Sequence, residues 1–380
     1  MATGGSTTGQ APGRWLRTVR LPRQPFLRHG LITLVAGVAL FLLTDSLGPF
    51  NDFQMAQIAI YAVAVAGLGL LTGWNGQISL GHGALMAVGA FATAELNIHT
   101  NVALALQILA GVAAAAVAGV IVGMIAARLR GPYLAGATLA LALALPEIAV
   151  KYSTVLGGEE GLTLNPLTSP RSVNLDRWMA WISLLCALLV TMLLANLATS
   201  RFGRAFRAVR DDEIAASLAG INVARTQVLA FVVSSACAGL AGSLLGLAVG
   251  NVGPQSFEVA LSISLLAAMV IGGTGGMLGA WIGGFFLVYV PQWSSSVSHS
   301  LHLSTAVESN LSLAFYGVVL MVVIIVAPSG IQGGIEAAAR LAGRLAFGRP
   351  PLLAPAESDL VSPSPATDTP RPIRNPKEDT

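Results

Sequence analysis

Long apolar runs alternate with short polar segments along most of this 380-residue chain. A helix rises about 1.5 Å per residue, so about 20 apolar residues cross the roughly 30 Å hydrocarbon layer of a membrane. Two apolar windows are unusual, because 78–96 is interrupted by glycines and 258–273 is short, so either could be re-entrant. We therefore expect an all-α polytopic membrane protein with about eight to ten transmembrane helices. The windows lie near residues 30–47, 54–72, 78–96, 102–126, 133–150, 178–198, 228–249, 258–273, 277–291 and 311–327.

The two ends of the chain differ from the part between them. Residues 1–29 carry five arginines and no acidic residue, which is typical of a cytoplasmic segment before a first span. The apolar run that follows has no small-residue cleavage site, so we expect it to remain as an uncleaved span. Residues 331–380 are rich in proline, serine and threonine, which predicts a largely disordered cytoplasmic tail. The transmembrane domain is expected at 30–330, with an inner loop at 200–226.

Composition excludes a soluble globular protein and a nucleotide site of the common type. With 54% hydrophobic and 10% charged residues, the chain has too few polar side chains to cover a soluble surface. Its only lysines, Lys151 and Lys377, do not follow a glycine, so the phosphate-binding pattern GxxxxGK[ST] does not occur. We expect no enzyme activity and no cofactor bound by this chain. Cys186 and Cys237 lie inside apolar runs and are expected to pack as small hydrophobic residues.

The placement of charge predicts the topology. Basic residues near span ends favour the cytoplasmic side, and alternate crossings then place 128–130, 201–225 and 340–349 inside if the amino terminus is inside. The acidic residues Asp45, Asp52, Glu159, Glu160 and Glu258 fall outside on the same count, although Lys151, Arg171 and Arg177 do too. Both termini are therefore expected in the cytoplasm.

Polar residues and glycines gather in one apolar neighbourhood, GWNGQISLGHGALMAVGAF, at 73–91. One interpretation is tight helix packing, because glycine lets helices approach closely. The other is a broken helix that lines a substrate pathway, where free amides at a helix N-terminus would meet a carboxylate. On the second interpretation the predicted pathway residues are Asn75, Gln77, Ser79, His82 and Thr138.

Three further segments have a simpler interpretation beside a functional one. RLRGPYLAGATLALALALPE at 128–147 passes from cytoplasmic arginines into a span that contains a proline, and span geometry alone explains that pattern. LGGEEGLTLNP at 156–166 is a glycine-rich outer loop whose adjacent acids are ordinarily just solvated. IGGTGGMLGAWIGGFF at 271–286 repeats the small-residue style of 81–91, which is a hint of internal duplication.

The stretch RFGRAFRAVRDDEIAASLAG at 201–220 is polar although apolar spans flank it. Arg204, Arg207 and Arg210 are spaced by three and share one side of a helix, with Phe206, Ala208 and Val209 away from it. Gly220 is expected to end that helix. Arginines in an inner loop also obey the positive-inside bias, but topology alone does not require the acids at 211–213 or the small residues after them. The pattern favours an amphipathic docking element for a cytoplasmic partner.

These segments together resemble one known family. GQISLGHGALMAVGAF, RLRGPYLAGATLAL, LGGEEGL, SRFGRAFRAVRDDEIAASLAGINVARTQVLAFVVSSACAGLAGSL and SFEVALSISLLAAMVIGGTGGMLGAWIGG follow in the order typical of LivM-type permease subunits of branched-chain amino acid ABC importers. The resemblance covers about residues 55 to 330. The outer loop departs from it, with Val155 and Leu156 before the glycine pair where the family commonly has a threonine directly before it.

The resemblance implies a set of partners and a role for the polar stretch. The partners are separate ATPase subunits that hydrolyse ATP, a second related permease and an extracytoplasmic solute-binding protein. The substrate would be a branched-chain or other apolar amino acid moved into the cell. The residues implied in coupling to the ATPase are Arg204, Arg207, Arg210, Asp212, Glu213, Ala215, Ala216 and Gly220.

Two alternatives remain open at this point. Related permeases import urea or short amides, and the altered outer loop leaves the substrate undecided. A secondary transporter driven by protons or sodium would instead need ionisable groups at membrane depth. The spans offer little beyond His82 and Glu147 for that purpose, and Glu147 lies near the outer boundary.

Overall fold

The computed structural model describes residues 49–129, 131–166, 173–274 and 276–300, with separate positions between 30 and 41 and between 314 and 339. The chain divides into two units, Met1–Ile335 and Glu336–Thr380, and every element below belongs to the first. The basic segment 1–29 lies outside the described residues, and so do most of the predicted spans 30–47 and 311–327 and most of the tail.

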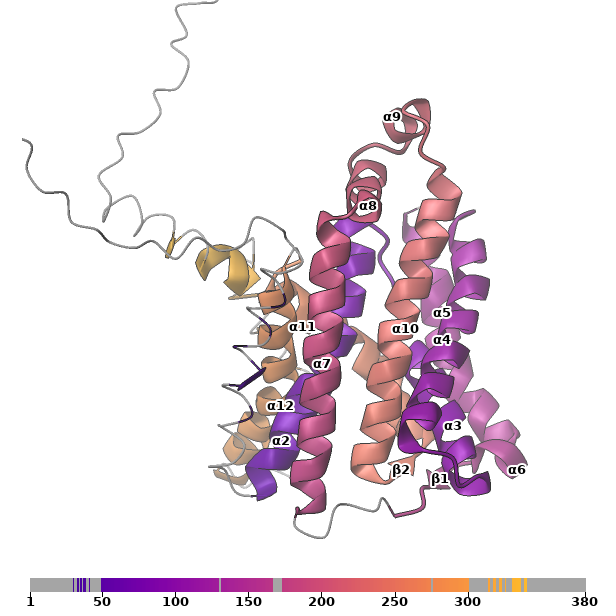
Figure 1. The fold of residues 1–380 in the computed structure, drawn as a ribbon, viewed down its shortest axis with the longest axis vertical. Coiled ribbons are helices and arrows are strands. Elements are labelled where there is room, and N and C mark those ends of the chain that lie inside the picture. Colours follow the sequence, from indigo (N-terminus) through magenta and orange to yellow (C-terminus); the bar gives the residue numbers. More distant parts are fainter. Residues whose placement is uncertain are drawn as a thin grey trace, which may run out of the picture. The chain divides into compact units, whose positions relative to one another are not determined.

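Helices make up nearly all of the described part, which confirms the all-α polytopic prediction (Figure 1). The first elements are α2 (Pro49–Gly69), the π-helical turn η1 (Leu70–Trp74), α3 (His82–His99), α4 (Leu104–Ala126), α5 (Pro132–Lys151), α6 (Ser153–Leu156) and strand β1 (Leu162–Thr163). They are followed by α7 (Leu175–Thr199), α8 (Arg201–Asp211), α9 (Glu213–Leu218), α10 (Val223–Val249), strand β2 (Asn251–Val252), the 3₁₀ turn η2 (Pro254–Phe257), α11 (Val259–Gly272) and α12 (Met277–Ser300). Six helical stretches of the described residues are long and apolar enough to cross a membrane, and α12 contains a shorter apolar stretch, Met277–Trp293.

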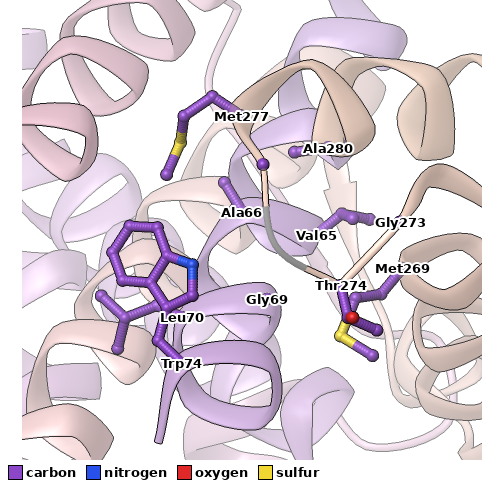
Figure 2. Close-up of a pocket in the computed structure, with 11 residues that line it drawn as sticks. Val65, Ala66, Gly69, Leu70, Trp74, Met269, Gly273, Thr274, Met277 and Ala280 are labelled. Atoms are coloured by element: carbon purple, nitrogen blue, oxygen red, sulfur yellow. The ribbon is translucent and has the colours of Figure 1, made fainter. Parts of the chain in front are cut away.

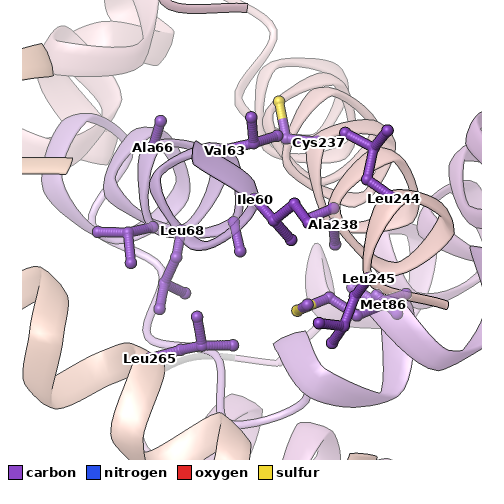
Figure 3. Close-up of a cluster of buried hydrophobic side chains, with 14 of the residues drawn as sticks. Ile60, Val63, Ala66, Leu68, Met86, Cys237, Ala238, Leu244, Leu245 and Leu265 are labelled. Carbon is purple, nitrogen blue, oxygen red and sulfur yellow. The ribbon is translucent and has the colours of Figure 1, made fainter. Parts of the chain in front are cut away.

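Helices α2 and α10 form the centre of the packing. Helix α10 packs along α3 and α4, while α2 packs along α7, α10 and α12. Figure 3 shows side chains of α2 such as Ile60 and Val63 beside Ala238 and Cys237 of α10. Both helices are apolar on every side, as expected for helices that are buried in protein or face lipid.

Glycines line the contact between α10 and its two neighbours. A Cβ atom at Gly89 of α3 would collide with the backbone of Gly239 in α10, and one at Gly242 would collide with the carbonyl of Met86 in α3. Across the same contact the Thr93 hydroxyl lies 2.7 Å from the hydroxyl of Ser243. Small residues and interhelical hydrogen bonds are the usual means of packing helices in lipid. The tight-packing interpretation is therefore correct for Gly89.

Two polar regions lie at opposite ends of the helices. Helices α8 and α9 are at one end, and the short pairing of β1 with β2 is at the other (Figure 1). The strands are antiparallel with Leu162 opposite Val252. Beside them the side chains of Gln255 and Asn251 donate to the carbonyls of Glu159 and Glu160, at 2.9 and 3.3 Å. The segments around residues 160 and 210 thus lie at opposite ends of the membrane-length helices, as the predicted number of crossings requires.

An ion pair explains why one basic residue, Arg177, lies on the side where the predicted topology places the acidic residues. Arg177 at the start of α7 lies 3.4 Å from the carboxylate of Asp52 at the start of α2, and the Asp52 side chain is only 1% exposed. A buried carboxylate requires a partner, because it loses its hydration on burial. Arg177 therefore holds the first turns of α2 and α7 together.

Replacing Arg177 with alanine is expected to lower the stability of the purified protein. The change leaves the buried Asp52 carboxylate without its cation, at a cost of about 3 kcal/mol. Thermal unfolding can be monitored as the loss of monodisperse protein on heating. The midpoint temperature of that loss should be clearly lower in the variant. The matched control is Lys151→Ala, which removes an exposed cation near the end of α5. Adding Asp52→Asn to Arg177→Ala should recover much of the loss, and an unchanged midpoint in Arg177→Ala would contradict the pairing.

Candidate functional site

The glycine-rich stretch after α2 breaks the helix as the second interpretation predicts. Helix α2 widens into the π turn η1, residues 75–81 form no regular structure, and α3 begins only at His82. Gly76 has a φ of +76°, a conformation that glycine adopts without strain. Three carbonyls of η1 are satisfied within the break, because Leu70, Thr72 and Leu71 accept from the amides of Asn75, Gly76 and Gln77 at 3.1–3.2 Å.

All five predicted pathway side chains are buried in or beside this break. The Asn75 amide donates to the Gln77 side chain at 2.9 Å, and the Ser79 hydroxyl accepts from the Gly81 amide at 3.4 Å. Thr138 of α5 accepts from the Leu80 amide at 3.0 Å. The structure therefore joins Thr138 to the break across 58 residues of sequence. Their predicted role in substrate passage stays a prediction.

The start of α3 is less open than a carboxylate site requires. The Gly83 amide donates to the hydroxyl of Ser262 in α11 at 3.0 Å. This N-terminal amide was expected to be free to bind a carboxylate, and the structure shows that it is not. A Cβ at Gly83 would lie 2.7 Å from the same hydroxyl, which shows how closely α11 approaches. His82 is fully buried, and neither ring nitrogen has a hydrogen-bond partner among the described residues. Ser262 is a site residue that sequence reasoning missed, since nothing in its apolar span marks it.

A small cavity lies where η1 meets the turn between α11 and α12. Figure 2 shows Leu70 and Trp74 at the lower left, Met277 above them, and Met269 and Thr274 on the right. The cavity has a volume of about 10 Å³, near the least that holds one water molecule. In this conformation an amino acid does not fit there.

Several larger spaces lie away from the break. A groove of about 970 Å³ between α4, α7 and α10 is lined by aliphatic side chains and the two cysteines, and it contains none of the predicted pathway residues. A pocket of about 300 Å³ at the β1 end is polar. In its wall the Asn97 side chain donates to Gln107 and accepts from the backbone amide of Asn165. These amides were missed, although their place beside the turn between two apolar runs was visible in the sequence.

The polar stretch at 201–220 forms two helices, where the arginine spacing predicted one. Asp212 is extended and caps α9 by accepting from the amides of Ile214 and Ala215 at 2.8 and 3.0 Å. Ser200 caps α8 in the same way. Aspartate is among the best N-cap residues, so a second cap inside the stretch divides the helix. Of the predicted apolar side, Phe206 and Val209 are buried and Ala208 is partly exposed.

The three predicted arginines share one side of α8, but each binds a backbone carbonyl. Arg204 donates to Thr199 at 3.1 Å and Arg207 to Ala198 at 2.8 Å, both at the end of α7. Arg210 donates to Gly73 at 2.7 Å, in the π turn η1 that follows α2. Cations are favourable at helix C-termini, where carbonyls lack intrahelical donors. The arginines therefore attach α8 to the ends of two membrane helices.

The remaining predicted coupling residues have mixed positions. Glu213 accepts from the buried Gln227 of α10 at 2.9 Å and so fixes α9 to α10. Ala216 is buried, while Ala215 is exposed. Gly220 has a φ of +83° and ends α9, as predicted, with open space around it.

Two exposed apolar side chains on α9 are the clearest surface feature that the sequence reasoning missed. Ile214 is 73% exposed and Leu218 is 85% exposed. They are four residues apart and lie on the same face of the helix. Exposed large apolar residues at a polar end of the molecule are typical of an interaction site. The signal was an apolar pair at helical spacing in an otherwise polar and small-residue stretch.

Comparison with known proteins gives a consistent set of relatives. The family model described as the permease component of branched-chain amino acid transport systems matches residues 52–326. The high-affinity branched-chain amino acid transport system permease proteins LivM of Salmonella typhimurium and Escherichia coli K12 are each 31% identical over 255 residues. The match covers 60% of this chain, and the chain spans 60% of the length of either relative. LivH of Salmonella typhimurium is 36% identical over 165 residues, which are 43% of this chain and 50% of that protein. No solved structure gives a significant match.

Proposed function

Since the chain belongs to the family of permease components of branched-chain amino acid transport systems, we propose that it is the membrane-spanning subunit of an ATP-driven importer. It would move branched-chain or other apolar amino acids into the cell. The match over residues 52–326 carries this proposal, because it covers the whole set of well-described helices. ATP would be hydrolysed on separate subunits, and a solute-binding protein would deliver the substrate together with a second, related permease.

Neutral polar groups in the break support a substrate that carries no net charge. Asn75, Gln77, Ser79 and Thr138 offer amides and hydroxyls, which bind a zwitterion weakly enough to release it. The polar pocket around Asn97 and Gln107 would then serve the opposite end of the same route. An ion-coupled carrier is not favoured, because Glu147 is exposed on α5 and the buried Asp52 is paired with Arg177.

The α8–α9 end would face the cytoplasm and dock on the ATPase. Ile214 and Leu218 would enter an apolar cleft of that subunit, while Glu213 and the three arginines keep α9 and α8 attached to the membrane helices. A short helix with a small apolar face suits insertion into a groove. The basic loop at this end also fits the positive-inside bias. The protein would accordingly sit in the bacterial inner membrane with both termini inside.

Reconstitution tests the proposal directly. In proteoliposomes that contain this chain with its ATPase and permease partners, L-leucine uptake is expected to depend on ATP and on the binding protein, at least about tenfold above the rate without ATP. The control uses ATPase subunits that bind but do not hydrolyse ATP. Uptake driven by a proton gradient without ATP would contradict the proposal, and so would ATP-driven uptake of urea without that of L-leucine.

A further inference from the structure

Arg210 connects α8 to the broken helix and not to α7. One guanidinium nitrogen donates to the Gly73 carbonyl at 2.7 Å. The other two nitrogens donate to the Asp211 carboxylate at 2.9 and 3.1 Å, which fixes the orientation of the guanidinium plane. The carbonyls of Leu70, Leu71 and Thr72 accept from amides within the break. The carbonyl of the following residue, Gly73, accepts instead from Arg210 of α8. A charge-assisted hydrogen bond of this kind is stronger than a neutral one.

The backbone around Gly73 is packed against Arg210 on one side and against the α11–α12 turn on the other. A Cβ at Gly76 would lie 2.8 Å from Cγ of Arg210. A Cβ at Gly73 would collide with the carbonyl of Thr274. Neither glycine leaves space for a side chain, so a movement of Arg210 toward this backbone must displace it. A withdrawal of Arg210 acts on the backbone through the hydrogen bond to Gly73.

The far end of the break is held just as closely by two other helices. The Leu80 amide binds Thr138 of α5, and a Cβ at Gly81 would lie 2.7 Å from the Thr138 carbonyl. The Gly83 amide binds Ser262 of α11. The segment 75–81 is therefore a short connection from α8 to α3, α5 and α11, with Asn75, Gln77 and Ser79 buried and Ile78 exposed. It contains three of the five predicted pathway residues and is followed directly by a fourth, His82.

We infer that Arg210 is a positioning residue that transmits movement of α8 to segment 75–81 and to the cavity at Trp74. Trp74 follows Gly73 directly and lines that cavity, with Thr274 on the opposite wall. Withdrawal of Arg210 with α8 would pull Gly73 away from Thr274 and widen the closed cavity. Arg204 and Arg207 hold α8 to α7 and would not have this effect. The inference rests on the proposed ATP-driven function.

Uptake and hydrolysis measured together test the inference. Arg210→Met keeps the side-chain stem and removes the donor, so L-leucine uptake per ATP hydrolysed is expected to fall about tenfold while hydrolysis continues. Arg210→Lys restores one donor and should recover part of the ratio. Arg201→Met is the matched control, because Arg201 is exposed at the start of α8, with its guanidinium over the Phe202 ring, and its ratio should stay within about twofold of the unmodified protein. A normal ratio in Arg210→Met would overturn the inference.

A labelling measurement separates this outcome from a failure of the proposed function or of folding. With Cys186 and Cys237 replaced by alanine, a cysteine is placed at Met277 in the cavity wall. Its rate of maleimide labelling should change when the reconstituted ATPase is trapped with ATP and vanadate, and Arg210→Met should abolish the change. If the labelling rate of Arg210→Met still changes on trapping the ATPase, the inference about Arg210 is overturned, while the proposed function stands. Absence of ATP-driven uptake by the unmodified complex would instead remove the proposed function.

Discussion

Replacing Ile214 and Leu218 together with aspartate is expected to abolish ATP-driven uptake while the protein still inserts and folds. Both side chains are largely exposed, so their loss costs this chain little packing. In the proposed complex they are the central apolar contacts of α9, and each buried anchor of an interface is worth about 2 kcal/mol or more. Two anchors replaced by charges should therefore weaken the subunit interaction by at least about 100-fold. Copurification of the ATPase and uptake of L-leucine are the measurements.

The matched control introduces the same charge at an exposed apolar position of the opposite end. Leu175 is 43% exposed at the start of α7, where an added carboxylate is favourable to the helix. Leu175→Asp should leave copurification of the ATPase unchanged. If the double variant retains full copurification and uptake, α9 is not the docking element, whatever the role of Arg210.

Replacing Gly242 with leucine is expected to prevent the membrane helices from assembling. A Cβ there already collides with the Met86 carbonyl, and a backbone group has no alternative rotamer to adopt. Helix α10 also packs along α3, α4 and α2, so moving it away from α3 disturbs the whole centre. Overpacking in a core commonly costs about 1–3 kcal/mol, and a leucine between two backbones should exceed that range. Loss of the monodisperse peak in size-exclusion chromatography and degradation in the cell would report it.

Gly136 provides the control for that substitution. It lies on an exposed side of α5, with no atom near the position of a Cβ. Gly136→Leu replaces a poor helix former by a good one, so the protein should be as stable as the original or slightly more so. Equal behaviour of the two leucine variants would show that the close contact between α10 and α3 is not needed for assembly.

Much of the architecture was predictable from local pattern. Apolar windows locate the helices because a membrane allows few other ways to satisfy the backbone. The break at 75–81 was indicated by Gly73, Gly76 and Gly81 among polar residues, and the buried side of α8 by Phe206 and Val209. These features depend on composition within about 20 residues of sequence, so they can be predicted from the sequence without a structure.

The partners of the site residues were not predictable in this way. Spacing placed Arg204, Arg207 and Arg210 on one side of a helix, but their carbonyl partners depend on where α2 and α7 end in space. Gly83 meets Ser262 across 179 residues of sequence, and no local signal marks that pair. The division between α8 and α9 was open to prediction from the capping tendency of Asp212, but the regular arginine spacing concealed it.

The pairing at the β1 end also constrains the order of synthesis. The carbonyl of Glu160 takes its donor from Asn251, which leaves the ribosome 91 residues later. Until then the loop that contains β1 has no strand to pair with, and only the completed α10 brings β2 to it. This rim must therefore form late in biogenesis, and a nascent chain arrested before residue 251 should expose the loop to protease.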